Sequence, residues 1–75
     1  MKEKITNTAE FRRWVRLQVV SQEISMAELA RQMEIPQARI SDAIHGRSTG
    51  NKYIIPIIRK LEGDEENFKE FLKAI

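Results

Sequence analysis

The stretch SMAELARQMEIPQARISDAIHG, residues 25–46, holds two short segments of helical period with a break between them. Ser25 and Glu28 have the spacing of a capping box, which predicts the start of the first helix. Pro36 has no backbone N–H and disfavours helical geometry in the residue before it, so it suits the first turn of the second helix. Gly46 ends that helix as a left-handed C-cap. The stretch therefore predicts two short helices that pack closely together.

Similar signals predict a helix before this pair. Asn7 and Glu10 again have capping-box spacing, and the helix that they begin runs to about Ser21. Its apolar residues recur at helical spacing, which leaves three arginines on the other side. These are Arg12, Arg13 and Arg16.

Two more helices are predicted after a polar loop, GRSTGN. The cluster YIIPII is too short to classify by period alone, and Pro56 favours an early helical turn over an interior strand. Gly63 closes this fourth helix, and Asp64 caps the last one. The helical period then places the following residues in the core: Phe11, Trp14, Val15, Val19, Leu29, Ala30, Met33, Ile40, Ala43, Ile44, Phe68, Phe71, Leu72 and Ile75.

The length and residue inventory limit what the chain can do. With 75 residues, it has room for one all-α domain over residues 1–75, and no room for a second, catalytic domain. Cysteine is absent and His45 is the only histidine, which excludes a thiol nucleophile, a disulfide framework and a structural zinc site. We therefore expect that the protein is not an enzyme and that it binds no metal, cofactor or small-molecule substrate.

The charge is unevenly distributed, although the net charge is only +2. Residues 1–63 carry 11 Lys and Arg against 7 Asp and Glu, whereas residues 64–75 carry 2 against 4. A basic body with an acidic end fits a polyanion-binding surface, and also an ordinary solvated surface of mixed charge. Because no apolar run suits a signal peptide or a membrane span, we expect a cytoplasmic protein without membrane contact.

The third helix, which runs to His45, has two distinct faces. Its apolar side is made of Ile40, Ala43 and Ile44, and the core holds the helix by this side. The opposite side carries Ala38, Ser41, Asp42 and His45, with Arg39 at its margin and Gln37 at the exposed start. This arrangement is that of a helix-turn-helix, whose second helix enters the DNA major groove.

The segment MAELARQMEIPQARISDAIHG resembles the helix-turn-helix of the lambda-repressor-like family, which includes phage repressors, Cro proteins and Xre-type regulators. The resemblance extends over residues 8–75 and implies a compact five-helix DNA-binding domain. The sequence departs from the family pattern at Glu34, where glycine is usual in the turn, and at Met26, where a phosphate-binding glutamine is frequent. The matching positions are Leu29, Ala30, Met33, Ile35, Gln37, Ile40, Ser41, Ile44 and Gly46.

The resemblance implies that Gln37 contacts a base, and its amide can both donate to and accept from adenine. Ala38 can contact a thymine methyl group, Arg39 a guanine or a phosphate, and Asp42 only cytosine. The predicted base-contact residues are Gln37, Ala38, Arg39, Ser41 and Asp42, and the predicted phosphate-contact residues are His45, Arg47, Ser48 and Lys52. Residues 1–6, with Lys2 and Lys4, are a candidate basic arm that follows the DNA.

Each assignment has an alternative. Gln37 can be a solvated residue of a first helical turn, and Arg39 and Asp42 can pair with each other. His45 can be a surface or capping residue. The arginines Arg12, Arg13 and Arg16 can form a solvated face or a second DNA contact.

We expect a sequence-specific transcriptional regulator that binds double-stranded DNA, of the phage or mobile-element repressor and Cro type. Such a chain acts by occupying an operator, as a homodimer on two half-sites. The dimer surface is expected at YIIPII or around Phe68 and Phe71 of the last helix. The alternative is a protein-interaction module, of the antirepressor or antitoxin kind, that uses the same fold without binding DNA.

Overall fold

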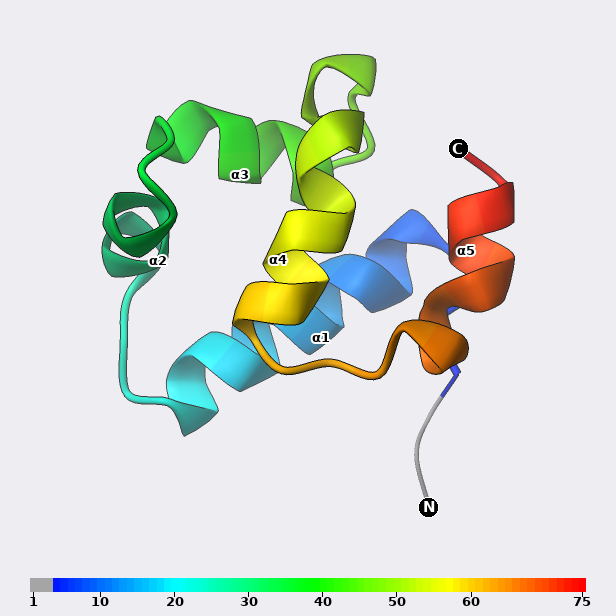
Figure 1. Cartoon of the computed structure of the whole chain (residues 1–75), viewed down its shortest axis with the longest axis horizontal. Coiled ribbons are helices and arrows are strands. Elements are labelled where there is room, and N and C mark those ends of the chain that lie inside the picture. The colour runs from blue at the N-terminus through cyan, green and yellow to red at the C-terminus, as the bar shows by residue number, and fades with distance from the viewer. Residues whose placement is uncertain (1–3) are drawn as a thin grey trace.

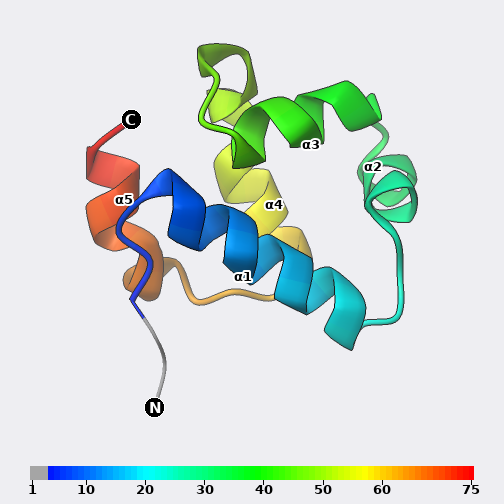
Figure 2. The same ribbon diagram turned by 180° about the vertical axis from the view of Figure 1, so that it is seen from behind.

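Helix α1, Thr8–Ser21, lies at the back of the molecule in Figure 1 and at its front in Figure 2. The computed structural model describes residues 4–75, and every regular element in that range is a helix. The Asn7 side chain accepts a hydrogen bond of 2.9 Å from the Glu10 N–H, so the predicted cap is confirmed. The Glu10 carboxylate reaches back to Thr6, whose N–H and hydroxyl donate to it at 2.7 and 2.8 Å. These bonds fix the chain before the helix as well as the helix start.

Ile5 ties the N-terminal segment to the rest of the molecule. Its side chain is buried, and its N–H donates a hydrogen bond of 2.9 Å to the Asn67 carbonyl. The arm predicted over residues 1–6 is therefore held in place at Ile5 and Thr6. Of its two lysines, Lys4 is exposed, and Lys2 lies outside the described residues.

Helices α2, Met26–Met33, and α3, Gln37–Ile44, are joined by only three residues (Figure 1). The Ser25 hydroxyl oxygen accepts a hydrogen bond of 3.0 Å from the Glu28 N–H, which confirms the predicted start of α2. The Glu28 carboxylate forms an ion pair with Arg31. α3 ends one residue before the predicted end, with His45 as its C-cap.

The loop predicted at GRSTGN is partly helical. The 3-10 helix η1, Ser48–Tyr53, leads directly into α4, Ile54–Lys60, and Pro56 lies in the first turn of α4 as predicted. η1 packs against the backbone of α3 at Gly50, where a Cβ atom would lie 2.2 Å from the Ala43 nitrogen. Only glycine permits this approach, because real Cβ atoms do not come so close to backbone atoms.

Three of the helices end at a glutamate in the left-handed conformation. The φ angles of Glu23, Glu34 and Glu62, after α1, α2 and α4, are 57°, 58° and 61°. α3 instead uses Gly46, with φ of 77°. In each case the N–H groups of the left-handed residue and the next one bond back to carbonyls of the last turn, as in a Schellman motif.

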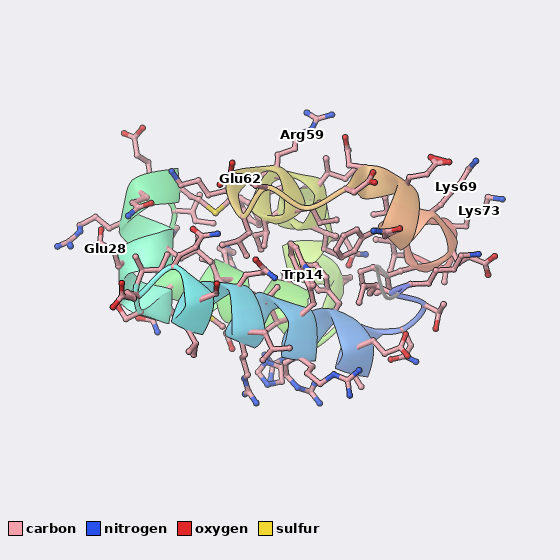
Figure 3. All side chains as sticks on the ribbon, turned by 90° about the horizontal axis from the view of Figure 1, so that it is seen from below. Trp14, Glu28, Arg59, Glu62, Lys69 and Lys73 are labelled. Carbon is pink, nitrogen blue, oxygen red and sulfur yellow. The ribbon has the colours of Figure 1, made fainter. Side chains whose placement is uncertain are left out.

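Gly63 therefore has a different role from the predicted one. The left-handed residue after α4 is Glu62, so the prediction that Gly63 closes this helix was one residue off. A Cβ atom at Gly63 would lie 2.7 Å from Cζ2 of Trp14, which lies between α1 and α4 in Figure 3. Gly63 makes room for this indole ring.

The last α-helix is shorter than the sequence predicts. A 3-10 turn η2, Glu65–Phe68, precedes α5, Lys69–Lys73, and the Asp64 carboxylate caps η2 by accepting from the Glu66 N–H at 3.1 Å. Because α5 ends at Lys73, Ile75 is half exposed and the prediction that it joins the core was wrong.

The core is a single cluster centred on Phe11, whose ring lies 5.1 Å from that of Phe71 and 6.1 Å from that of Phe68. Phe68 and Phe71 are 1% and 2% exposed, so they are not available as the dimer surface proposed for them. Trp14, Met33 and Leu72 are partly buried at the edge of the cluster. Among residues 4–75, the buried apolar residues are Ile5, Phe11, Val15, Val19, Leu29, Ala30, Ile40, Ala43, Ile44, Ile54, Ile57, Ile58, Leu61, Phe68 and Phe71.

Candidate nucleic-acid interface

α3 is held by one side and exposed on the other. Ile40, Ala43 and Ile44 are at most 4% exposed, and they anchor the helix to the core. On the outer side, the two residues Gln37 and Ala38 at the start of the helix are exposed. The helix therefore presents a polar surface that begins at its N-terminal end, as the sequence predicts.

The turn before α3 places a non-glycine residue, Glu34, in the left-handed conformation, which is energetically unfavourable. Glu34 has φ of 58° and ψ of 40°, and its N–H donates to the Arg31 carbonyl at 3.1 Å. A non-glycine residue in this conformation costs about 1–2 kcal/mol. Pro36, with φ of −62° and ψ of 140°, is the residue before the first helical residue, so α3 has no side-chain cap. The prediction placed Pro36 inside the first turn, one residue too far.

The two long sides of α3 border different hollows. On one side, Gln37 and Ser41 share a hollow with Arg16 of α1 and Met26 of α2. The side chain of Met26 is partly buried and packs against the core.

On the other side of α3, η1 forms the second wall of a shallow groove. Arg39 lines it together with Ser48, Thr49, Asn51 and Lys52. Two predicted phosphate-contact residues, Ser48 and Lys52, are thus next to a predicted base-contact residue. The structure brings them together because Gly50 lets η1 lie against α3.

The Asp42 carboxylate is bound by side chains of its own chain. It accepts a hydrogen bond of 2.9 Å from the Thr49 hydroxyl and lies 3.0 Å from Nη1 of Arg39 and 3.4 Å from Nη1 of Arg47. The pairing of Arg39 with Asp42 is the alternative raised from the sequence, and it is confirmed. The Asp42 side chain is only 15% exposed. Its acceptor sites therefore point toward η1, and few remain for a base.

These contacts also shift the titration of Asp42. The hydrogen bond from Thr49 holds the pKa of the Asp42 carboxyl below its usual range. Partial desolvation opposes this effect, and the hydrogen bond and charge of Arg39 and the charge of Arg47 add to it. The group stays ionised at neutral pH and holds both arginines.

His45 acts as a cap on its own helix. Its Nδ1 lies 2.8 Å from the Ser41 carbonyl oxygen, and it donates to this oxygen because a carbonyl only accepts. The Ser41 hydroxyl lies 3.4 Å from the same nitrogen. The imidazole is exposed. The capping alternative for His45 is therefore the one that the geometry favours.

The remaining predicted phosphate contacts are exposed cations. Arg47 begins the connection to η1, and its side chain is 59% exposed despite its contact with Asp42. The Lys52 ammonium lies 5.2 Å from the centroid of the Tyr53 ring, within the range of a cation–π contact.

Thr49 was not predicted as part of this surface, whereas Arg16 was predicted only as part of an arginine face that is either solvated or a second DNA contact. Thr49 is seven residues from Asp42, across a helix end, so no period along the sequence relates the two. Arg16 comes next to α3 only through the packing of α1.

No helix in the described part of the chain is long and apolar enough to cross a membrane. Within the same residues no three His, Cys, Asp or Glu side chains gather as metal ligands would.

The chain matches no protein-family model, no curated protein and no solved structure.

Proposed function

We propose that α2, α3 and the turn between them form a helix-turn-helix that binds double-stranded DNA, with α3 in the major groove. The observation that supports the proposal is the packing of α3: its apolar side is buried, and Gln37 and Ala38 are exposed at its N-terminal end. Two short helices joined by three residues leave the start of the second helix exposed, which is the end that meets base edges in this motif.

Gln37 is the principal base-contact residue of this proposal. Its amide can pair with N7 and N6 of adenine, and no other base edge in the major groove offers the same pair of groups. Ala38 is next to it and suits a thymine methyl group. Ser41 lies one turn further along on the Gln37 side, where a hydroxyl can donate or accept.

Asp42 has a revised role in the proposal. Because Thr49, Arg39 and Arg47 occupy its carboxylate, we assign Asp42 to holding these side chains and not to contacting cytosine. Arg39 is held on the η1 side, where it can meet a phosphate without leaving its partner. Ser48 and Lys52 on that side, together with Arg47 beside Asp42, supply further contacts to the DNA backbone.

A protein that binds DNA in this way can regulate transcription by occupying an operator, and we propose this role, of the phage-repressor and Cro type. A small DNA-binding domain gains affinity as a homodimer on a two-fold site. Ile55 of YIIPII is 37% exposed, so part of the surface first considered for the dimer remains available.

The proposal is tested by the salt dependence of DNA binding. Fluorescence anisotropy of the full chain with a random duplex pool, and with duplexes enriched from it, is expected to give an affinity that falls steeply as salt rises, because phosphate contacts release counterions. One enriched two-fold site is expected. Absence of binding at low salt would contradict the proposal. It would favour a protein-interaction module, for which the exposed Leu17 and Val20 on α1 are available.

A further inference from the structure

The arginines of this protein differ in whether they have a partner. Four arginines outside α1 lie within 4 Å of a carboxylate: Arg31 at Glu28, Arg39 and Arg47 at Asp42, and Arg59 at Glu65. On α1, by contrast, neither Arg12 nor Arg16 forms a hydrogen bond or an ion pair with any residue from 4 to 75. These two guanidinium groups lie on one helix face without a partner among residues 4–75, so they are open to a group from outside that part of the chain.

Arg16 lies next to the surface of α3 that carries Gln37, and Arg12 precedes it by one turn on α1. Arg16 lines the same hollow as Gln37 and Ser41, and Arg12 and Arg16 together line a shallow groove over the outer face of α1. Figure 2 shows α1 in front with α3 directly above it. The unpaired charges therefore continue the predicted base-contact surface onto a second helix.

The dimensions of DNA explain why cations are needed on both sides of α3. The major groove is about 12 Å wide, close to the diameter of a helix with its side chains. A helix seated in it has one phosphate backbone along each of its long sides. The η1 side of α3 offers Lys52 and Arg39, and the α1 side offers Arg16 and Arg12.

We propose that Arg12 and Arg16 bind phosphates of the DNA strand that runs along the α1 side of α3, so that η1 and α1 hold the two strands of one groove. The inference rests on the proposed function, and it extends the contact surface to a helix outside the helix-turn-helix. Guanidinium groups suit this task because they bind phosphate oxygens in a bidentate manner. Phosphate is favoured over an acidic protein partner because Arg16 shares its hollow with Gln37 and Ser41.

The test compares Arg12→Ala, Arg16→Ala and the double variant with Arg59→Ala as a matched control. Arg59 has the same charge and an exposed side chain, it is paired with Glu65, and it points away from α1 in Figure 3. For each full-length variant, anisotropy over a salt series gives the affinity and the slope of log K against log salt. Thermal melts followed by circular dichroism show whether the variants remain folded.

Each lost phosphate contact is expected to reduce the salt slope by about 0.9. Binding to enriched and random duplexes is expected to weaken by the same factor, because phosphates carry no sequence information. Arg16→Lys is expected to retain most of the slope. If wild type binds DNA but the double variant has the affinity and slope of Arg59→Ala, this inference is wrong and the proposed function stands. If wild type binds no duplex, the proposed function fails first, and a titration with an acidic peptide then identifies the other kind of partner.

Discussion

The hydroxyl of Thr49 donates a hydrogen bond of 2.9 Å to the carboxylate of Asp42, which joins η1 to the outer side of α3. The same carboxylate holds Arg39 and Arg47. One acidic side chain thus fixes the position of two cations and of the segment that carries Ser48 and Lys52. We therefore assign Asp42 an organising role in this surface.

Asp42→Asn is expected to raise the affinity for random duplex DNA and to steepen its salt dependence, because Arg39 and Arg47 are released and one negative charge is lost. Stability is expected to fall, since Thr49 and the arginines lose a charged acceptor. Anisotropy on random and enriched duplexes measures the first effect. A loss restricted to the enriched duplex would show instead that Asp42 contacts a base.

Acid is expected to destabilise the protein through two carboxyls. Hydrogen bonds from Thr6 lower the pKa of Glu10, and that from Thr49 lowers the pKa of Asp42, so both bind protons more readily when unfolded. Their contribution is present above the unfolded pKa values and is lost as the pH falls through the folded ones. The free energy of unfolding in urea should therefore decrease below about pH 4. Glu10→Gln and Asp42→Asn together should flatten this decrease, and an unchanged decrease would refute the assignment.

Gly50→Ala is expected to destabilise the protein and to weaken DNA binding together, because a methyl group at this position overlaps the backbone of Ala43. Overpacking of this kind costs about 1–3 kcal/mol, and η1 must move away from α3 to relieve it. Urea denaturation gives the loss of stability. Asn51→Ala, at an exposed position of the same segment, serves as the control and should be close to neutral. Equal stability of both variants would mean that η1 does not pack as described.

Glu34→Gly is expected to stabilise the protein by about 0.5–1 kcal/mol. Glycine removes the steric cost of the left-handed conformation, and its greater freedom in the unfolded chain cancels part of the gain. Glu34→Ala is the matched control, because it removes the same charge but keeps Cβ in the strained position. A gain of similar size in the alanine variant would show that the charge, and not the backbone, is responsible.

The starts of α1 and α2 could be predicted because a side chain at each start caps the helix. Asn7 and Ser25 accept hydrogen bonds from N–H groups three residues later, and such spacing is visible in any sequence. The two sides of α3 were also predictable from local sequence, because the helical period alone separates Ile40 and Ile44 from Gln37.

The remaining features depend on contacts between distant residues. The 3-10 helix η1 was predicted as a loop, because its polar residues are ordered by the approach of Gly50 to α3 and not by a period of their own. Ile5 lies in a polar segment that gives no helical signal, and it is held against the distant Asn67, whose carbonyl accepts its N–H. The occupation of Asp42 by Thr49 depends in turn on where η1 lies.

We propose that the exposed start of α3 contacts bases, and the affinity of Gln37→Ala for DNA tests this contact most directly. The variant is measured by anisotropy on the enriched duplex and on random duplexes at the same salt concentration. We predict that the substitution weakens the binding free energy for the enriched duplex by about 1–3 kcal/mol and relaxes the preference at one base pair. Binding to random DNA is expected to be unchanged. Equal affinity of wild type and variant on the enriched duplex would contradict this proposal.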